Sequence, residues 1–319
     1  MFSVVICTHN PDATTLGRLL DALRQQTLPS GQWELVLVDN GSAPPVRQLV
    51  TLDWHPRARI VEEATLGVLN ARLCAIRETH GDLLLFLDDD TLPAPDYLAV
   101  ARHMMAEHPF LGVLGGYGRA EYQGTLEPWM QAFATFYLDY TVAPDRQDEF
   151  QYAMTHTLGP WTPPTAGSII RRSVLDRYAD GVSTNSTRGL LGRRGKGKDA
   201  PSLQGGEDED IDLTAVDMGL ATGITKKMQF THVIPPWRLD PVYLMRLLYS
   251  CNYSTATLLV SRGIKKRIAA SEPSAFLQGA RKAKRVLRPP TMEDECWTAL
   301  AKGYQDGLAG NPFDPRYRK

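Results

Sequence analysis

The chain has 319 residues, of which 43% are hydrophobic and 22% charged, and its formal net charge is -1 at pH 7. This length and composition allow a complete buried core, in one large domain or two closely joined ones. The near-zero net charge argues against nucleic acid as a partner. The four cysteines lie singly, without a Cys-x-x-Cys pair, which predicts neither a zinc site nor a disulfide framework and favours a reducing cytoplasm.

The first half of the sequence predicts a mainly parallel sheet. Residues 2–6 lack a basic region and a cleavage site, so they predict a first strand and not a signal peptide. Apolar runs indicate strands over 3–7, 34–39, 58–62 and 83–87, and leucines at helical spacing indicate helices over 15–26 and 67–79. Strands alternating with helices are typical of an α/β fold.

The run from Leu83 to Asp90 ends in three adjacent carboxylates. A short apolar run suits a strand buried on both faces, and α/β proteins bind ligands where such strands end. A divalent cation with oxygen ligands would offset the repulsion among the three acids. The alternative is a solvated acidic turn, in which Asp90 and Thr91 cap a helix over 93–106.

Polar clusters follow three of these strands, at Thr8 to Pro11, Asp39 to Ser42 and Asp88 to Asp90. Each one alone is explained by a turn or a helix cap. The carboxyl ends of parallel strands meet at one edge of a sheet, so together the clusters predict a single site.

The middle of the chain is rich in aromatic residues, which either stack on sugar rings or, more commonly, fill a core. They are Trp129, Phe133, Phe136, Tyr137, Tyr140, Tyr152 and Trp161. Residues 181–206 are rich in glycine and basic residues, which predicts a mobile loop, either inert or a lid over a phosphate. Five acids then fill six positions, 207–212, more than a helix N-terminus requires, and one of them could serve as a general base.

These motifs together resemble family 2 glycosyltransferases of the GT-A fold. The resemblance extends over about residues 2–219 and is carried, in the family's order, by Val4 to Asn10, Val36 to Ser42, Gly67 to Arg72, Asp88 to Asp90 and Gly206 to Asp208. It implies a Rossmann-like, mainly parallel sheet flanked by helices, a nucleotide-sugar donor, Mn²⁺ or Mg²⁺, and inversion at the anomeric carbon.

The resemblance also implies a role for individual residues. Asp90 would ligate the metal, Asp208 would be the catalytic base, and Glu207 would orient the acceptor or its partner. Donor contacts are expected from Thr8, Asn10, Asp39, Asn40, Arg72, Asp88 and Asp89, and acceptor contacts from Trp161, Ala166 and Gly167. Two positions depart from the family, with Thr214 where an arginine is frequent and Leu73 where an asparagine is frequent, which weakens inference about the donor.

The C-terminal part adds two expectations. His232 is either structural or a further metal or diphosphate ligand. A helix is expected over 241–259, followed by a basic stretch over 262–288, which is either a solvated helix face or a peripheral anchor on anionic lipid. No apolar stretch is long enough to span a membrane, so membrane contact would be peripheral.

The sequence thus predicts a donor-binding half over 1–115, an acceptor-binding half over 116–240 and a basic helical extension over 241–319. The expected function is transfer of a sugar, UDP-sugars being favoured, to a hydroxyl of a glycan, lipid-linked or other acceptor in the cytoplasm. A nucleotidyltransferase acting on a sugar phosphate would need a glycine-rich phosphate loop after the first strand, which residues 8–15 lack. A non-catalytic carbohydrate-binding relative would be expected to have lost the acid at the metal position or the acid at the base position, and here both Asp90 and Asp208 are present.

Overall fold

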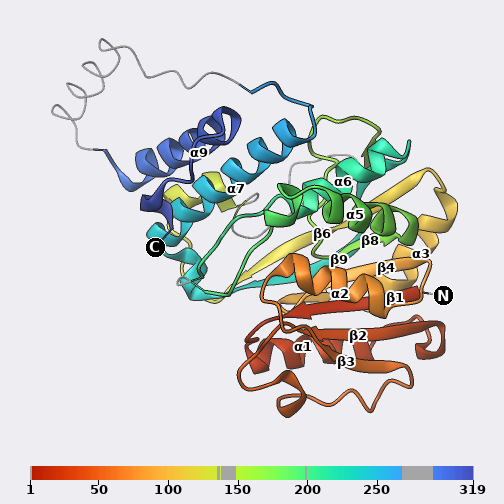
Figure 1. Ribbon diagram of the computed structural model, residues 1–319. Coiled ribbons are helices and arrows are strands. Elements are labelled where there is room, and N and C mark those ends of the chain that lie inside the picture. The colour runs from red at the N-terminus through yellow and green to blue at the C-terminus, as the bar shows by residue number, and fades with distance from the viewer. Residues whose placement is uncertain (1, 135–136, 138–148, 198–199, 268–289, 319) are drawn as a thin grey trace, which may run out of the picture.

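The computed structural model describes residues 2–134, 137, 149–197, 200–267 and 290–318. A nine-stranded mixed sheet runs through them in the order β3-β2-β1-β4-β8-β6-β9-β5, with β7 also paired to β9 (Figure 1). The strands are β1 Phe2–Thr8, β2 Trp33–Asp39, β3 Ala58–Glu62, β4 Leu83–Asp88, β5 Thr91–Pro93, β6 Leu111–Tyr122, β7 Phe150–Ala153, β8 Ser168–Arg171 and β9 Ala221–Ile234.

Strands β1 to β4 are parallel to one another, as the alternation of strands and helices predicts. Strand β8 is antiparallel to both β4 and β6, whereas β6 and β9 are parallel. The expected donor-binding and acceptor-binding halves therefore share one sheet, and the α/β fold class is confirmed.

Helices cover both faces of the sheet. The longer ones are α1 Ala13–Arg24, α2 Val68–Glu78, α3 Tyr97–Glu107, α5 Arg172–Thr184, α6 Glu207–Asp217, α7 Pro241–Ser261 and α9 Met292–Ala309. The shorter ones are η1 Ser30–Gln32, η2 Val46–Gln48, η3 Pro128–Met130, α4 Gln131–Phe133, η5 Arg188–Leu190, η6 Pro236–Leu239 and η7 Pro315–Tyr317.

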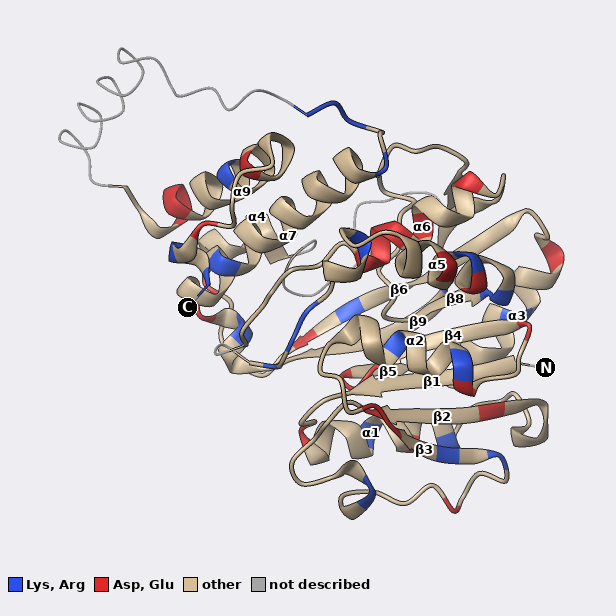
Figure 2. Cartoon of the chain, viewed as in Figure 1, with Lys and Arg blue, Asp and Glu red and all other residues tan. Residues whose placement is uncertain are grey.

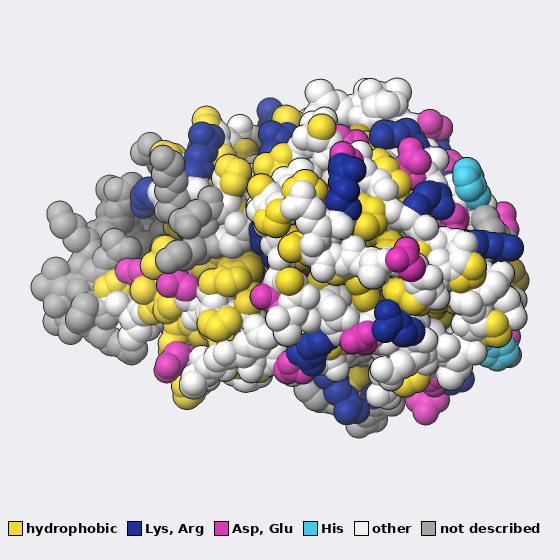
Figure 3. All heavy atoms as spheres, turned by 90° about the horizontal axis from the view of Figure 1, so that it is seen from below, with side chains coloured by type: hydrophobic (Ala, Val, Ile, Leu, Met, Phe, Trp, Pro, Cys, Tyr) yellow, Lys and Arg dark blue, Asp and Glu magenta, His cyan; other side chains and the backbone are white. Residues whose placement is uncertain are grey.

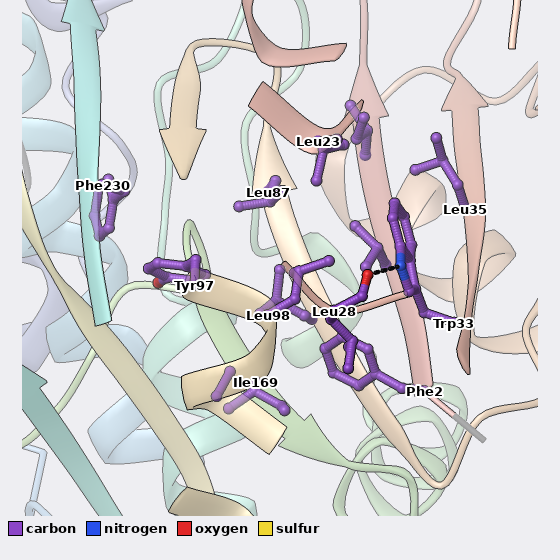
Figure 4. Packing of buried hydrophobic residues seen from close by; sticks show 14 of the residues in the cluster. Phe2, Leu23, Leu28, Trp33, Leu35, Leu87, Tyr97, Leu98, Ile169 and Phe230 are labelled. Carbon is purple, nitrogen blue, oxygen red and sulfur yellow. Dashed lines mark hydrogen bonds between the residues drawn. The ribbon is translucent and has the colours of Figure 1, made fainter. Parts of the chain in front are cut away.

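Alternate residues of the central strands enter two separate cores. Val4 and Ile6 of β1 pack with α1 and α3 on one face, whereas Val5 packs with α2, α5 and α6 on the other. Figure 4 shows the first core, in which Trp33 Nε1 donates to the Leu28 carbonyl at 3.2 Å. Burial on both faces explains why these strands read as unbroken apolar runs.

The alternative of a helix over 93–106 directly after the acidic run is wrong in its first turn. Residues Thr91–Pro93 form β5, which pairs antiparallel with β9, and α3 begins only at Tyr97. The residue before a proline is pushed toward extended backbone, and both Leu92 and Ala94 precede prolines.

Helices α7 and α9 pack closely because glycines face the contact. A Cβ atom at Gly303 would lie 2.2 Å from the Tyr249 carbonyl oxygen, and one at Gly307 would lie 2.4 Å from that of Tyr253. The expected helix over 241–259 corresponds to α7, whereas residues 268–288, most of the basic stretch, lie outside the described part of the chain. Within the described ranges, no helix combines the length and apolarity needed to cross a membrane.

Candidate active site

A cavity of about 200 Å³ lies where the ends of β1 and β4 meet the first turns of α2 and α6. Residues of the stretches 193–197 and 200–205, of η6 and of the first turn of α7 supply the other walls. In open α/β sheets this edge is where ligands bind. The residues singled out from the sequence that line the cavity are Thr8, Asn40, Arg72, Asp88, Asp89, Asp90, Ala166, Glu207 and Asp208.

Asp89 is held by protein groups on both of its oxygens. The Thr8 hydroxyl donates to Oδ2, and Lys196 Nζ lies 2.8 Å from Oδ1 and Oδ2. Burial raises the pKa of Asp89 even though the Lys196 ammonium opposes that effect. Lys196 comes from the basic loop, so the structure brings that loop to the acidic run.

Asp90 has a different set of neighbours. His232 Nε2 lies 3.3 Å from Asp90 Oδ1, and Arg238 Nη1 lies 3.3 Å from His232 Nε2. Although burial alone would raise it, His232 and Arg238 hold the pKa of Asp90 well below its usual range. Burial and the Asp90 charge raise the pKa of Asp88 to about 6. The acidic run therefore keeps negative potential that a cation could offset.

The donor atoms of this run fit a divalent cation that is shared with its ligand. Within the described ranges, no three His, Cys, Asp or Glu side chains are grouped as a metal-binding set. Mg²⁺ commonly takes one or two carboxylates, and phosphates and water complete its coordination. Asp90 Oδ1 is buried and makes no hydrogen bond of ordinary geometry within the same ranges. Asp90, with His232 behind it, fits that shared arrangement.

Glu207 and Asp208 form the first turn of α6 and share one arginine. Arg72 Nη1 lies 2.6 Å from Asp208 Oδ1 and 3.2 Å from Glu207 Oε1. Burial alone would lower the pKa of Arg72, but Asp208, Glu207 and Asp88 raise it well above its ordinary value. The structure thus places Arg72 on the Glu-Asp pair.

The two acids of the pair differ in exposure. The Asp208 side chain is 27% exposed, whereas that of Glu207 is 7% exposed and its Oε2 makes no hydrogen bond to any described residue. Burial and the Asp208 charge raise the pKa of Glu207 to about 7. Thr165 donates its hydroxyl proton to Asp208 Oδ1, so both of these hydrogen bonds to Asp208 fall on one oxygen.

Asp39 and Asn10 do not line the cavity but order the loops around it. Asp39 accepts from the backbone N–H groups of Ser42 at 2.9 Å and Val46 at 2.8 Å. Asn10 has a φ of 47° and accepts from the Ala43 N–H at 2.8 Å.

Asn40 reaches the cavity and also fixes the start of α2. Its side chain donates to the carbonyls of Glu63 and Thr65 and accepts from the Gly67 N–H at 2.7 Å. Gly67 has a φ of 140°, which favours glycine, and it caps the helix that carries Arg72. The Asn40 side chain therefore helps to position Arg72.

The expected acceptor residues are not all at the cavity. Ala166 lines the cavity. Gly167 is not part of the cavity lining, and its carbonyl accepts a hydrogen bond from the buried Tyr97 hydroxyl. Trp161 also lies outside the cavity lining and donates to the Thr157 carbonyl at 3.3 Å.

Three lysine and arginine residues that line the cavity were missed as individual sites. Arg193 and Lys196 belong to a stretch whose glycines and charges predicted a basic loop, but composition did not indicate which cation faces inward. Lys198 of the same stretch lies outside the described residues. Arg238 is 4% exposed and lies six residues after His232, in a stretch from which only His232 was predicted as a site residue.

Similarity searches with the sequence identify several curated glycosyltransferases. An N-acetylglucosaminyltransferase of Rhizobium sp. (strain N33) is 26% identical over 267 residues, which are 81% of this chain and 54% of that protein. The validoxylamine A glucosyltransferase of Streptomyces hygroscopicus subsp. limoneus is 38% identical over 102 residues, 31% of this chain and 22% of that protein. The matches span less than two thirds of the length of the curated relatives.

A comparison with solved structures supports the fold independently. A mannosyltransferase from Pyrobaculum calidifontis, solved with GDP-Man and Mn²⁺, superposes with a TM-score of 0.53 at 17% sequence identity. The superposition covers 96% of this chain and 86% of the mannosyltransferase chain. The expected GT-A fold is thereby confirmed.

The family model described as "Glycosyl transferase family 2" matches residues 3–178, which include the ends of β1, β2 and β4 and the acidic run. This match covers more than half of the chain, so the chain belongs to glycosyl transferase family 2.

Proposed function

We propose that this chain is a metal-dependent, inverting glycosyltransferase that transfers a sugar from a nucleoside-diphosphate sugar to an acceptor hydroxyl. The observation that supports it most directly is that the acidic run and the Glu-Asp pair open into one cavity. A UDP-sugar is the favoured donor, and a glycan or lipid-linked glycan is the favoured acceptor class. Relatives named as N-acetylglucosaminyl- and glucosyltransferases, and the mannosyltransferase solved with GDP-Man, support this donor class.

The proposed base is Asp208. Its Oδ1 already accepts from Arg72 and Thr165, so Oδ2 is the oxygen left to take a proton. As the acceptor oxygen attacks the anomeric carbon, its proton moves to Asp208, and the bond from that carbon to the diphosphate breaks with its electron pair on the leaving oxygen. Attack opposite to the leaving group inverts the anomeric carbon.

The remaining cavity residues would orient the reactants. Arg72 and Thr165 fix the Asp208 carboxylate, which limits it to orientations facing the cavity. Asp90, with His232, would hold Mn²⁺ or Mg²⁺, which when bound would neutralise charge on the departing diphosphate. Arg193 and Lys196 line the same cavity and could contact that diphosphate.

A screen of nucleotide sugars tests this function. The protein would be mixed with UDP-, GDP- and dTDP-sugars with and without Mn²⁺, and its melting temperature and donor hydrolysis would be measured. A ligand at about 100 times its Kd stabilises the native state by about 2.7 kcal/mol. The proposal requires one donor to raise the melting temperature only with metal, and no effect from any of the three classes would overturn it.

A further inference from the structure

Lys196 is held at the acidic run by a segment that is itself anchored. The Gly192 N–H donates to the Gly205 carbonyl, and Arg194 and Ser202 exchange backbone hydrogen bonds of 3.2 and 3.4 Å across this segment. The Val68 N–H at the start of α2 donates to the Arg193 carbonyl at 3.0 Å. The ammonium therefore reaches Asp89 from a braced backbone, and not as a freely extended surface side chain.

The Lys196 ammonium lies beside the acidic run, close to where a metal cation on Asp90 would bind. Lys196 Nζ contacts both oxygens of Asp89, and its charge also acts on Asp90. A divalent cation that arrives alone must share this negative potential with the lysine, and the two positive charges repel each other. Metal binding without a diphosphate is therefore opposed by Lys196.

A diphosphate changes that balance because it offers the lysine another partner. Phosphate oxygens accept charge-assisted hydrogen bonds from ammonium groups as readily as carboxylates do. Lys196 lines the cavity together with Arg193, so a diphosphate beside Asp90 would lie within the same chamber. Lys196 could then leave Asp89 without losing a counterion.

We propose that Lys196 couples metal binding to donor binding, pairing with Asp89 while the cavity is empty and with the donor diphosphate once metal and donor are bound. This inference rests on the proposed function. In it, Lys196 weakens the binding of the metal ion alone and strengthens the binding of metal and donor together. Such coupling is reciprocal, so UDP tightens Mn²⁺ by the same factor by which Mn²⁺ tightens UDP.

The test is a binding cycle on Lys196→Met, which keeps the length of the side chain and removes its charge. Mn²⁺ binding would be followed by loss of the free-ion electron paramagnetic resonance signal, with and without saturating UDP, GDP or dTDP. We expect the variant to bind Mn²⁺ alone about tenfold more tightly, because Asp89 loses its counterion. We also expect the tightening of Mn²⁺ by the nucleotide to fall by about tenfold or more.

Two control variants separate charge from general damage. Lys302→Met is the matched control, because Lys302 pairs with Asp306 on α9. In this pair and in the Lys196–Asp89 pair, the lysine side chain is 31% exposed and the aspartate side chain 10%. Lys302→Met should leave both Mn²⁺ affinities unchanged. Lys196→Arg keeps the charge and should keep the weak binding of Mn²⁺ alone.

The outcomes separate this inference from the proposed function. If wild-type protein shows coupling between Mn²⁺ and a nucleotide, but Lys196→Met binds bare Mn²⁺ no more tightly and keeps that coupling, the role of Lys196 is refuted and the function stands. If the wild type binds Mn²⁺ equally with and without each nucleotide, both the coupling and the metal-dependent function are refuted.

Discussion

At the scale of single residues, Asp90 and Asp208 have oxygens in different settings. Asp90 Oδ1 is buried 3.3 Å from His232 Nε2 and makes no hydrogen bond of ordinary geometry within the described ranges, whereas Asp208 Oδ1 accepts from Arg72 and Thr165. A buried oxygen without a hydrogen bond suits a metal ligand, and a carboxylate held through one oxygen keeps the other for proton transfer. Substitution by asparagine should therefore abolish metal-dependent donor binding at Asp90 but reduce only turnover at Asp208.

Asp90→Asn should abolish metal-dependent donor binding, because it removes the formal charge from the proposed metal ligand. Calorimetric titration of UDP with and without Mn²⁺ is the measurement. Asp96→Asn, an exposed position before α3, is the matched control. Unchanged metal-dependent affinity in Asp90→Asn would rule out Asp90 as the ligand.

Asp208→Asn should leave donor affinity nearly unchanged and reduce turnover by about 10²- to 10⁴-fold, the usual contribution of a general base. Steady-state transfer to an acceptor, alongside donor titration, measures both quantities. Asp176→Asn on α5 removes a largely exposed carboxylate and should be silent. Turnover near the wild-type level in Asp208→Asn would shift the role of base to another acid, Glu207 first.

At the scale of elements, α6 shows what the sequence could predict and what it could not. The density of acids predicted a functional helix start, and Glu207 and Asp208 do line the cavity. The same pattern gave no indication that Asp210 is fully buried between Arg188 and Arg262. Those arginines lie 22 and 52 residues away, and such long-range pairing leaves no local signal.

Thr214 belongs to the same buried cluster as Asp210. Its hydroxyl accepts from Arg188 at 3.3 Å and from Arg262 at 2.7 Å. The two arginines that pair with Asp210 are thus also held by a second residue of α6.

Asp210→Asn should destabilise the fold by about 3–5 kcal/mol, because it leaves two arginines, 12% and 9% exposed, without their shared carboxylate. Urea unfolding followed by circular dichroism measures the loss. Asp217→Asn removes a half-exposed partner of Arg262 and should cost less than about 1 kcal/mol. Equal losses in both variants would show that burial does not set the strength of this cluster.

At the scale of the whole molecule, charges of both signs are spread over the surface. Figure 2 shows acidic and basic residues on neighbouring elements around α6, and on the face in Figure 3 neither sign dominates. This distribution agrees with the net charge of -1.

The alternation of strands and helices was enough to predict the parallel part of the sheet, because each strand pattern is local. The pairing of β8 with both β4 and β6 depends on segments far apart in sequence and could not be read from it.

Stability of the whole fold should depend on pH through Asp212. Both of its oxygens are buried and make no hydrogen bond to any described residue, and burial raises its pKa well above the ordinary value of 3.8. The native state thus keeps a proton that the unfolded state releases, so the free energy of unfolding falls as pH rises above about 4 toward the native pKa.

Asp212→Asn removes this dependence. Its free energy of unfolding relative to wild type should increase from pH 5 to pH 8, as measured by urea unfolding at both values. Asp53→Asn, at an exposed position, should show a constant difference. A constant difference for Asp212→Asn as well would mean that Asp212 is ionised in the native state.

The contact between Arg262 and Asp210 also limits how this chain can be recombined with its relatives. The family match ends at residue 178, yet the proposed base lies at 208, and its helix is clamped by an arginine at the end of α7. A chimera that joins residues up to Leu239 of this chain to the C-terminal part of a relative would lose that clamp unless the relative supplies an arginine at the same place. A chimera of this protein should therefore stay folded when its junction lies after residue 262, and should lose stability when the junction lies between α6 and Arg262.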